Sequence, residues 1–248
     1  MKSALLTPDS HLEVDGSRYS VSAIVEALEP YLVEERAQRM KSVVETRIGR
    51  VMLGVEDLYK THNGAACLRT AEGLGLHRVA AVESRNTFQF SDQTEGDVHR
   101  KVTAHADRWV DLHRFGDAET LVEWARTQGM SIYGAGPRGQ LTAADLPADK
   151  PTLILFGNEK EGLRPETLAA CDDTFRIPMY GFTESFNVSV SVGIVLGQLV
   201  ERVRHRLAAD GRKSDLDQMT RDWLLARWYV RDVRASEMIL RRRLENLQ

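Results

Sequence analysis

Short apolar runs alternate with helix-like segments through the middle of this sequence, and this alternation restricts the fold more than any other feature. The apolar runs lie at residues 51–55, 79–82, 109–112, 132–133, 153–156 and 175–177. Helix-like segments between them lie at residues 64–74, 119–127 and 165–170. Strands that alternate with helices form a mostly parallel sheet with helices on both faces. The sequence therefore predicts an α/β fold for this region.

Helical patterns continue on both sides of this region. Residues 21–47 predict one or two helices, with Ser20 or Ser22 as the N-cap and a break at Pro30. Residues 187–207 predict a long apolar helix whose small side chains permit close packing. We therefore expect a helical extension before the α/β region and a long helix at the end of that region.

The last segment has the pattern of a separate helix. In residues 214–248, apolar side chains recur at alternating steps of three and four, which indicates a helix with a narrow apolar seam. Its other faces carry arginines that we predict to bind RNA: Arg221, Arg227, Arg231 and Arg234. A second interpretation stays open, in which the seam packs on the protein or on a partner subunit and the arginines are solvated. The expected parts are an N-terminal extension (1–47), a central domain (48–208) and a C-terminal extension (209–248).

Charge is distributed unevenly along the chain. The net charge of −3 is not typical of a nucleic-acid-binding protein. However, residues 197–248 contain 12 basic and 8 acidic residues, which gives this segment a net charge of +4. Arginine makes up 26 of the 33 basic residues; its planar guanidinium suits phosphate, although a GC-rich genome also raises arginine content. The C-terminal excess indicates an anionic partner without proving one.

Composition excludes several classes of protein. With 42% hydrophobic and 28% charged residues, the chain resembles a soluble globular protein. Its longest apolar stretch, residues 188–200, is too short to span a bilayer, and the N-terminus resembles no targeting peptide, so we expect a cytoplasmic protein. The two cysteines form no zinc pattern. His99, His105 and Asp107 match no known ligand spacing, so we expect no metal.

A glycine-rich segment matches a nucleotide-binding motif but lacks its context. The segment Gly134–Gly139 reads G-x-G-x-x-G after a predicted strand, and Glu159 follows at the distance of a ribose-binding acid. A Rossmann loop must open a crossover helix. Pro147 and Pro151 leave room for at most one helical turn before the next strand. We therefore expect a turn near a ligand or a simple loop, with a nucleotide-dependent enzyme as a secondary possibility.

Three other segments carry polar residues at positions suited to a site. The first, residues 60–71, contains His62, Asn63 and Arg69, with Asn63 as a predicted N-cap. The second is a buried strand that enters a polar loop with Glu159, and ligands bind at the carboxyl ends of parallel strands. The third, residues 177–190, is a loop that enters a helix, where Ser185 and Asn187 serve either a site or as an N-cap.

In this order, the three segments resemble the three signature motifs of the SpoU/TrmH family. The first motif is carried by His62-Asn63 and Arg69, the second by residues 156–159 with Gly162, and the third by residues 177–179 and 185–189. That family belongs to the SPOUT superfamily of S-adenosylmethionine-dependent RNA methyltransferases, whose fold contains a C-terminal trefoil knot. The resemblance covers about residues 47–205. The terminal extensions resemble the branch that methylates a guanosine of the tRNA D-loop.

The resemblance implies a reaction and roles for five residues. A methyl group passes from a sulfonium to a ribose 2′-hydroxyl, a weak nucleophile that must be deprotonated or polarised and held in line. Arg69 corresponds to the activating residue, either with its charge state shifted by an RNA phosphate or as a cation that lowers the pKa of the hydroxyl. Asn63 and Ser185 would orient Arg69 and the RNA. Glu159 would fix this network, and Asn187 would hold the third motif near the cofactor.

The resemblance also implies how cofactor and partners bind. Backbone groups of the knot loops would hold S-adenosyl-L-methionine, at Ala135, Gly157, Ile177, Met179 and Phe186. The glycine-rich segment would then let the backbone approach the adenosine. Family members act as homodimers with the site near the interface, and their RNA partner in the D-loop branch is tRNA.

Three alternatives remain at this point. The RNA target can be another tRNA position or a ribosomal RNA. The glycine-rich segment can serve a nicotinamide or other nucleotide enzyme. The chain can also be a non-catalytic RNA-binding protein that has kept the fold, although the presence of all five predicted catalytic residues argues against this.

Overall fold

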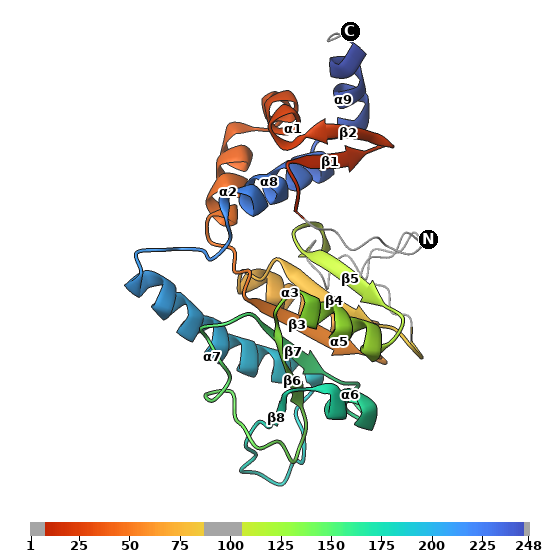
Figure 1. Cartoon of the computed structure of the whole chain (residues 1–248), viewed down its shortest axis with the longest axis vertical. Coiled ribbons are helices and arrows are strands. Elements are labelled where there is room, and N and C mark those ends of the chain that lie inside the picture. Colours follow the sequence, from red (N-terminus) through yellow and green to blue (C-terminus); the bar gives the residue numbers. More distant parts are fainter. Residues whose placement is uncertain (1–7, 87–105, 246–248) are drawn as a thin grey trace. The chain divides into compact units, whose positions relative to one another are not determined.

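The computed structural model describes residues 8–86 and 106–245, and their contacts separate into two compact units (Figure 1). The body unit contains Ile48–Lys213. The terminal unit combines Leu5–Arg47 with Ser214–Gln248. The segments predicted as two separate extensions therefore contribute to one unit.

A six-stranded sheet forms the centre of the body unit. Its strands are β3 (Val51–Glu56), β4 (Arg78–Val82), β5 (Asp111–Phe115), β6 (Ser131–Ala135), β7 (Thr152–Phe156) and β8 (Asp173–Phe175). They are ordered β5-β4-β3-β7-β6-β8, and every neighbouring pair is parallel. The predicted parallel sheet is confirmed.

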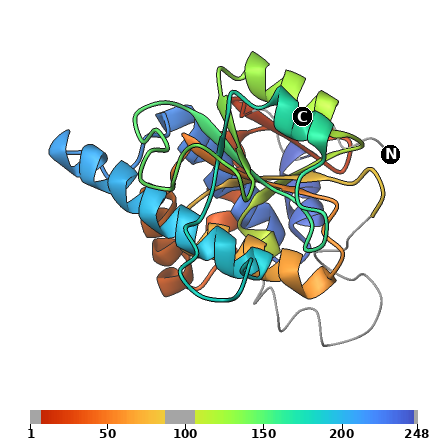
Figure 2. The same cartoon turned by 90° about the horizontal axis from the view of Figure 1, so that it is seen from below.

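Helices cover both faces of this sheet. On one side lie α3 (Thr61–Gly73) and α7 (Val188–Ala209), and on the other α5 (Ala118–Thr127) and α6 (Pro165–Ala170) (Figure 2). Each face of the sheet has its own hydrophobic core, and neighbouring residues of β3 belong to different ones. Leu53 packs with α3 and α7, whereas Met52 packs with α5. Alternate side chains of a strand point to opposite faces, so a strand covered on both faces is apolar throughout.

Two predicted strands are displaced in the structure. The strand expected at residues 109–112 is β5, which starts later because Trp109 N–H bonds back to Ala106 O (3.0 Å), in a 3-10 helix η2 (Ala106–Arg108). The strand expected at residues 175–177 is β8, which ends at Phe175. Beyond it, Arg176 N–H donates to Leu141 O (2.8 Å).

The glycine-rich segment has no Rossmann context. No helix lies between β6 and β7, and all of residues 136–151 are described. The connection instead crosses the end of β8, where Gly136 N–H donates to Phe175 O (2.9 Å). A Cβ atom on Gly139 would lie 2.3 Å from the carbonyl carbon of Phe175, so this crossing requires glycine. The expectation that the segment is not a Rossmann loop is confirmed.

The terminal unit begins with a hairpin that we did not predict. It pairs β1 (His11–Val14) with β2 (Ser17–Ser20) in antiparallel register. Asp15 and Gly16 form its turn with φ angles of 48° and 72°. Positive φ at both positions is typical of a type I′ turn, for which Asp-Gly is a preferred sequence.

The helices after this hairpin follow the prediction. Ser20 accepts a hydrogen bond from Ala23 N–H (3.2 Å) as the N-cap of α1 (Val21–Leu28). A 3-10 helix η1 (Glu29–Tyr31) contains Pro30 and separates α1 from α2 (Glu34–Val44).

The C-terminal segment differs from the single helix that we predicted. It forms α8 (Gln218–Asp232) and α9 (Ser236–Glu245), which are separated by Ala235 with φ 59°. The apolar surface of α8 is also wider than a seam, because α8 contacts β1, α1 and α2. Its buried side chains are Trp223, Leu224, Ala226, Arg227, Trp228 and Tyr229.

Among the described residues there is neither a membrane-spanning helix nor a cluster of metal-ligating side chains. No described helix has the length and apolar character needed to cross a membrane. Nor do the described residues gather three His, Cys, Asp or Glu side chains that could hold a metal ion. His99 and His105 lie outside the described residues, so their predicted lack of a metal role stays untested.

Candidate active site

A pocket of about 430 Å³ opens at the carboxyl ends of β6, β7 and β8. Three loops contribute to it: the start of the connection after β6, the polar loop after β7, and the segment between β8 and α7. All five residues predicted for the cofactor line this pocket: Ala135, Gly157, Ile177, Met179 and Phe186. Glu159 and Ser185 line it as well.

The polar loop after β7 folds tightly on itself. A Cβ atom on Gly157 would lie 1.9 Å from the carbonyl carbon of Gly162, so a side chain cannot be placed there without moving the backbone. Gly162 closes the turn with φ 71°. Asn158 Oδ1 accepts hydrogen bonds from the backbone N–H groups of Lys160 (2.9 Å) and Glu161 (2.7 Å). The loop is therefore held by hydrogen bonds between its own backbone and the Asn158 side chain.

A buried ion pair fixes the end of this loop. Glu56, the last residue of β3, is 1% exposed and accepts hydrogen bonds from Arg164 N–H (3.0 Å) and Arg164 Nε (2.9 Å). Thr167 Oγ donates to the same carboxylate (2.7 Å). A buried charge is tolerated when it is paired and hydrogen-bonded in this way. Sequence reasoning missed this anchor, because nothing in the spacing of these residues links them.

A chain of hydrogen bonds joins the three predicted motifs. Asn187 Nδ2 donates to Asn63 Oδ1 (3.2 Å), and Asn63 Nδ2 donates to a carboxylate oxygen of Glu159. The other oxygen of Glu159 accepts from the backbone N–H of Tyr59 (3.1 Å). Asn187 Oδ1 accepts from Ser189 N–H (2.9 Å), which makes Asn187 the N-cap of α7. The structure thus brings together three of the five predicted catalytic residues.

These contacts show why Asn63 is not a cap. Helix α3 begins at Thr61 with Lys60 as its N-cap, so the capping role predicted for Asn63 is wrong. Asn63 is only 2% exposed, and its amide instead spans the gap between Glu159 and Asn187.

The same contacts determine the charge of Glu159. Partial burial opposes ionisation of this carboxyl group, but the hydrogen bonds from Asn63 and from Tyr59 N–H outweigh that effect. The pKa of Glu159 is therefore lower than its ordinary value, and the group is a carboxylate at neutral pH.

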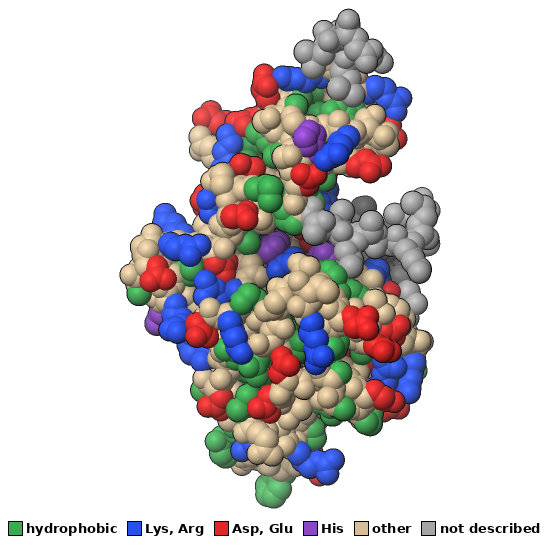
Figure 3. Space-filling model, in the orientation of Figure 1, with side chains coloured by type: hydrophobic (Ala, Val, Ile, Leu, Met, Phe, Trp, Pro, Cys, Tyr) green, Lys and Arg blue, Asp and Glu red, His purple; other side chains and the backbone are tan. Residues whose placement is uncertain are grey.

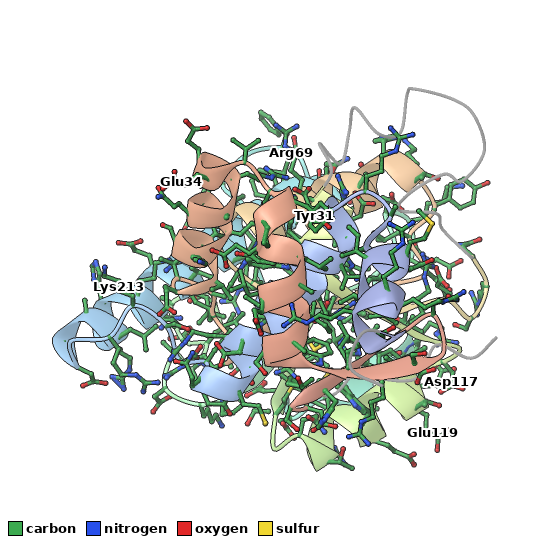
Figure 4. All side chains as sticks on the ribbon, turned by 90° about the horizontal axis from the view of Figure 1, so that it is seen from above. Tyr31, Glu34, Arg69, Asp117, Glu119 and Lys213 are labelled. Atoms are coloured by element: carbon green, nitrogen blue, oxygen red, sulfur yellow. The ribbon has the colours of Figure 1, made fainter. Side chains whose placement is uncertain are left out.

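Arg69 lies apart from this chain of contacts. Six positions separate it from Asn63 on α3, which places the two side chains about 120° apart around the helix and about 9 Å apart along it. Its side chain is exposed (Figure 4), and it does not line the pocket of its own chain. It makes no hydrogen bond to any residue that the structure describes. The arginine is thus free to meet a ligand or a second chain.

The predicted RNA-binding arginines of the C-terminal segment are mostly engaged in contacts within the terminal unit. Arg227 is 7% exposed and lies over the ring of Trp223, 4.6 Å from its centroid, so its predicted role as a surface contact is corrected. Arg221 is half-buried and donates to Leu216 O (2.7 Å). Arg231 is half-buried too, whereas Arg234 is exposed.

Most of the positive charge of residues 197–248 also lies outside the C-terminal helical segment (214–248). Residues 197–213, which complete α7 and the body unit, contain five basic and two acidic residues, a net charge of +3. Residues 214–248 contain seven and six, a net charge of +1. Arg212 and Lys213 are exposed at the end of the body unit.

The sequence of this chain is similar to those of known proteins. Residues 50–197 match the model of the SpoU rRNA Methylase family. A protein of Borreliella burgdorferi named tRNA (guanosine(18)-2′-O)-methyltransferase is 30% identical over 195 residues, which cover 76% of this chain and 85% of that relative.

Solved structures share the fold. The crystal structure of the TrmH/SpoU tRNA modifying enzyme of A. aeolicus aligns with a TM-score of 0.69 at 23% identity, over 81% of this chain and 98% of the other. The SpoU methyltransferase AviRb of Streptomyces viridochromogenes, solved in complex with AdoMet, aligns with a TM-score of 0.53 at 21% identity, over 61% and 57% of the two chains.

Proposed function

Since the chain belongs to the SpoU rRNA methylase family, we propose that it is an S-adenosylmethionine-dependent RNA 2′-O-methyltransferase that acts on a guanosine in the D-loop of tRNA. The observation that carries this proposal is the hydrogen-bonded contact of all three motifs through Asn187, Asn63 and Glu159, of which Glu159 lines the pocket. The relative named as a guanosine-18 methyltransferase supports the choice of target.

The pocket fits the proposed cofactor in size and chemistry. Its volume of about 430 Å³ is in the range of small-molecule sites. Apolar side chains for an adenine ring are present at Ile177, Met179 and Phe186, and carboxylates for a cationic ligand at Glu159 and Glu184. When bound, S-adenosylmethionine supplies a methyl group on a positively charged sulfur. Small residues allow the backbone to supply hydrogen bonds to such a ligand.

The protein's own residues then act on the ribose. The amino group and the carbonyl oxygen of the Asn63 side chain are both hydrogen-bonded, so its role is to hold Glu159 and α7 in place. Ser185 is exposed on the pocket wall and is available to orient the ribose or a phosphate. Arg69 would activate the 2′-hydroxyl, either as a base whose charge state an RNA phosphate shifts or as a cation that stabilises the developing oxyanion.

A second copy of the chain would complete the site. Hydrophobic side chains are exposed at the lower end of the body unit (Figure 3). In the loop before α7, the exposed hydrophobic residues are Tyr180 (96% exposed), Phe182 (109%) and Phe186 (41%). Exposed apolar patches commonly mark protein interfaces. A homodimer through this face would cover them, and Arg69 of one copy could approach the pocket of the other.

A trefoil knot and a cytoplasmic location complete the proposal. The close crossing of Gly139 over Phe175 supports a connection after β6 through which the chain after β8 is threaded. A tRNA substrate fits a cytoplasmic protein.

Methylation of RNA tests the activity directly. Unmodified total tRNA and ribosomal RNA are incubated with labelled cofactor, and the modified nucleotide is mapped. We expect label in tRNA at the D-loop guanosine. Label at another tRNA position or in ribosomal RNA would overturn the target but keep the activity, and no transfer to any RNA would overturn the proposal. Titration with S-adenosylhomocysteine and with NAD separates it from the nucleotide-enzyme alternative.

A further inference from the structure

An exposed aromatic ring lies in the turn between β3 and α3, beside the polar chain of the site. Tyr59 is 64% exposed, whereas its neighbour Leu58 is 1% exposed and packs in the core of the body unit. Asp57 reverses the chain before them with φ 46°, a strained value that its own hydrogen bonds to Ser84 and Arg85 support. The turn is therefore anchored, and Tyr59 projects from it into solvent.

The position of this ring is fixed relative to Glu159. The backbone N–H of Tyr59 donates to Glu159 Oε2 (3.1 Å). The side chain of the next loop residue, Lys160, places its Nζ atom 4.9 Å from the centroid of the Tyr59 ring. Aromatic ring, ammonium group and carboxylate thus form one group at the rim of the pocket, which Glu159 and Lys160 line.

The fold does not require this ring. Among the residues that the structure describes, the Tyr59 hydroxyl has no hydrogen-bond partner. Most of the side chain is exposed, so its removal would leave little cavity. An exposed cation–aromatic pair contributes only about 0.5–1 kcal/mol to stability. The ring is available to a ligand.

We infer that Tyr59 and Lys160 form the stacking surface for the base of the RNA nucleotide whose ribose enters the pocket, an inference that rests on the proposed function. The base of a nucleotide is attached to the carbon next to the one that carries the 2′-hydroxyl. Glu159 and Ser185 line the same pocket, and Tyr59 is bonded to Glu159 through its backbone N–H, so a ribose that enters this pocket has its base close to the rim where Tyr59 lies. Unpaired RNA bases are bound in proteins by stacking on aromatic rings, and a nearby cation neutralises the adjoining phosphate.

This surface positions a base but does not distinguish one base from another. Every base has a flat face that an aromatic ring accepts. We therefore expect Tyr59 to affect how RNA is held, and not which base is chosen or how the cofactor binds.

Substitutions of Tyr59 test the inference through kcat/KM on tRNA. Tyr59→Phe keeps the ring and should keep nearly wild-type activity, whereas Tyr59→Leu should lose about ten- to hundred-fold, in line with the loss of one stacked base. Lys160→Gln should lose less, and its activity should depend less on salt. Tyr31→Leu is the matched control, because Tyr31 is also 64% exposed (Figure 4) but lies in the terminal unit. The Tyr59 and Tyr31 variants should bind S-adenosylhomocysteine like the wild type, because neither residue lines the pocket.

A substrate without the target base separates stacking from other roles. In a tRNA that keeps the ribose but lacks the base at the mapped nucleotide, wild type and Tyr59→Leu should transfer methyl groups at similar single-turnover rates. An equal loss on both substrates, or full activity of Tyr59→Leu on intact tRNA, would overturn the inference while the wild-type activity upholds the proposed function. A wild-type protein that methylates no RNA would overturn both.

Discussion

Asn187 donates a hydrogen bond from Nδ2 to Asn63 Oδ1 over 3.2 Å, although 124 residues separate them in sequence. The remaining partners fix the direction of both amides. Asn187 Oδ1 accepts from Ser189 N–H and from Ser189 Oγ, so only its amino group can face Asn63. Asn63 in turn presents its amino group to Glu159. The chain of donors therefore ends at a group that can only accept, which is the ionised carboxylate.

Asn187→Ala should separate helix capping from site organisation. The variant loses the N-cap of α7 and the link to Asn63, so we expect a loss of about 1 kcal/mol in the free energy of unfolding and about a hundred-fold slower methyl transfer from misplacement of the site. Urea denaturation and single-turnover kinetics measure the two effects.

Asp117→Ala is the control for this variant. Asp117 caps α5 in the same body unit (Figure 4) by accepting from Thr120 N–H (2.7 Å), and it does not line the pocket. It should lose similar stability and keep its methyl-transfer rate. Equal kinetic losses in both variants would mean that stability alone explains the effect of Asn187.

Glu159→Gln should change how stability depends on pH. The pKa of Glu159 is lower in the folded protein than its ordinary value of 4.5, so the unfolded chain binds its proton more readily in acid. The carboxylate therefore contributes stability that is fully present above the ordinary value and is lost as the pH falls through the folded pKa. Wild type should exceed Glu159→Gln in stability at neutral pH, and the difference should shrink as the pH falls below the ordinary value of 4.5. A difference that is constant across this range would contradict the assignment.

Gly157→Ala should disrupt the pocket, because the added Cβ would lie 1.9–2.1 Å from backbone atoms of Gly162 and Leu163. Backbone overpacking of this kind commonly costs about 1–3 kcal/mol, and we expect at least a tenfold loss of affinity for S-adenosylhomocysteine, or about 1.4 kcal/mol. Calorimetric titration measures the affinity. Gly116→Ala is the control, because Gly116 does not line the pocket and its Cβ would meet nothing within 4 Å. A normal affinity of Gly157→Ala would show that the loop adapts.

The sheet and its helices could be predicted because each depends on local pattern. Strand β7 is apolar along its whole length, as a strand covered on both faces must be, and α6 starts at Pro165, a preferred first residue of a helix. The long helix α7 follows from its apolar length and from Asn187 as its cap.

The contacts of the site could not be predicted from local pattern. Glu159 meets Asn63 across 96 residues, and the two come together only because β3 and β7 are neighbours in the sheet. The hairpin could have been predicted, since Asp15-Gly16 is a strong turn signal between short strands. The break in the C-terminal segment was not, because Ala235 adopts φ 59°, which alanine rarely does.

Arg69→Ala should stop methyl transfer without affecting the fold or the cofactor site. The side chain is exposed and lies outside the pocket lining, so stability should change by no more than about 0.5 kcal/mol. Loss of an activating group should slow turnover by roughly two to four orders of magnitude. Arg69→Lys keeps the charge but not the planar fork, so partial activity would favour the electrostatic role and none would favour orientation by the fork. If Arg69→Ala kept more than about a tenth of wild-type turnover, the motif assignment would be wrong.

Two arginines of the C-terminal segment should behave in opposite ways. Arg227 lies buried over Trp223 in the core of the terminal unit, so Arg227→Ala should lower stability by about 2 kcal/mol, the value of a desolvated cation–aromatic contact. Arg234 is exposed, so Arg234→Ala should leave stability within about 0.5 kcal/mol of wild type. If Arg234 contacts an RNA phosphate, its loss should weaken tRNA binding and reduce the slope of log affinity against log salt by about one. Thermal unfolding and tRNA titrations at several salt concentrations measure both effects. A variant of Arg227 that keeps full stability but loses the salt-dependent affinity would restore the original interpretation of α8 as an RNA-facing helix.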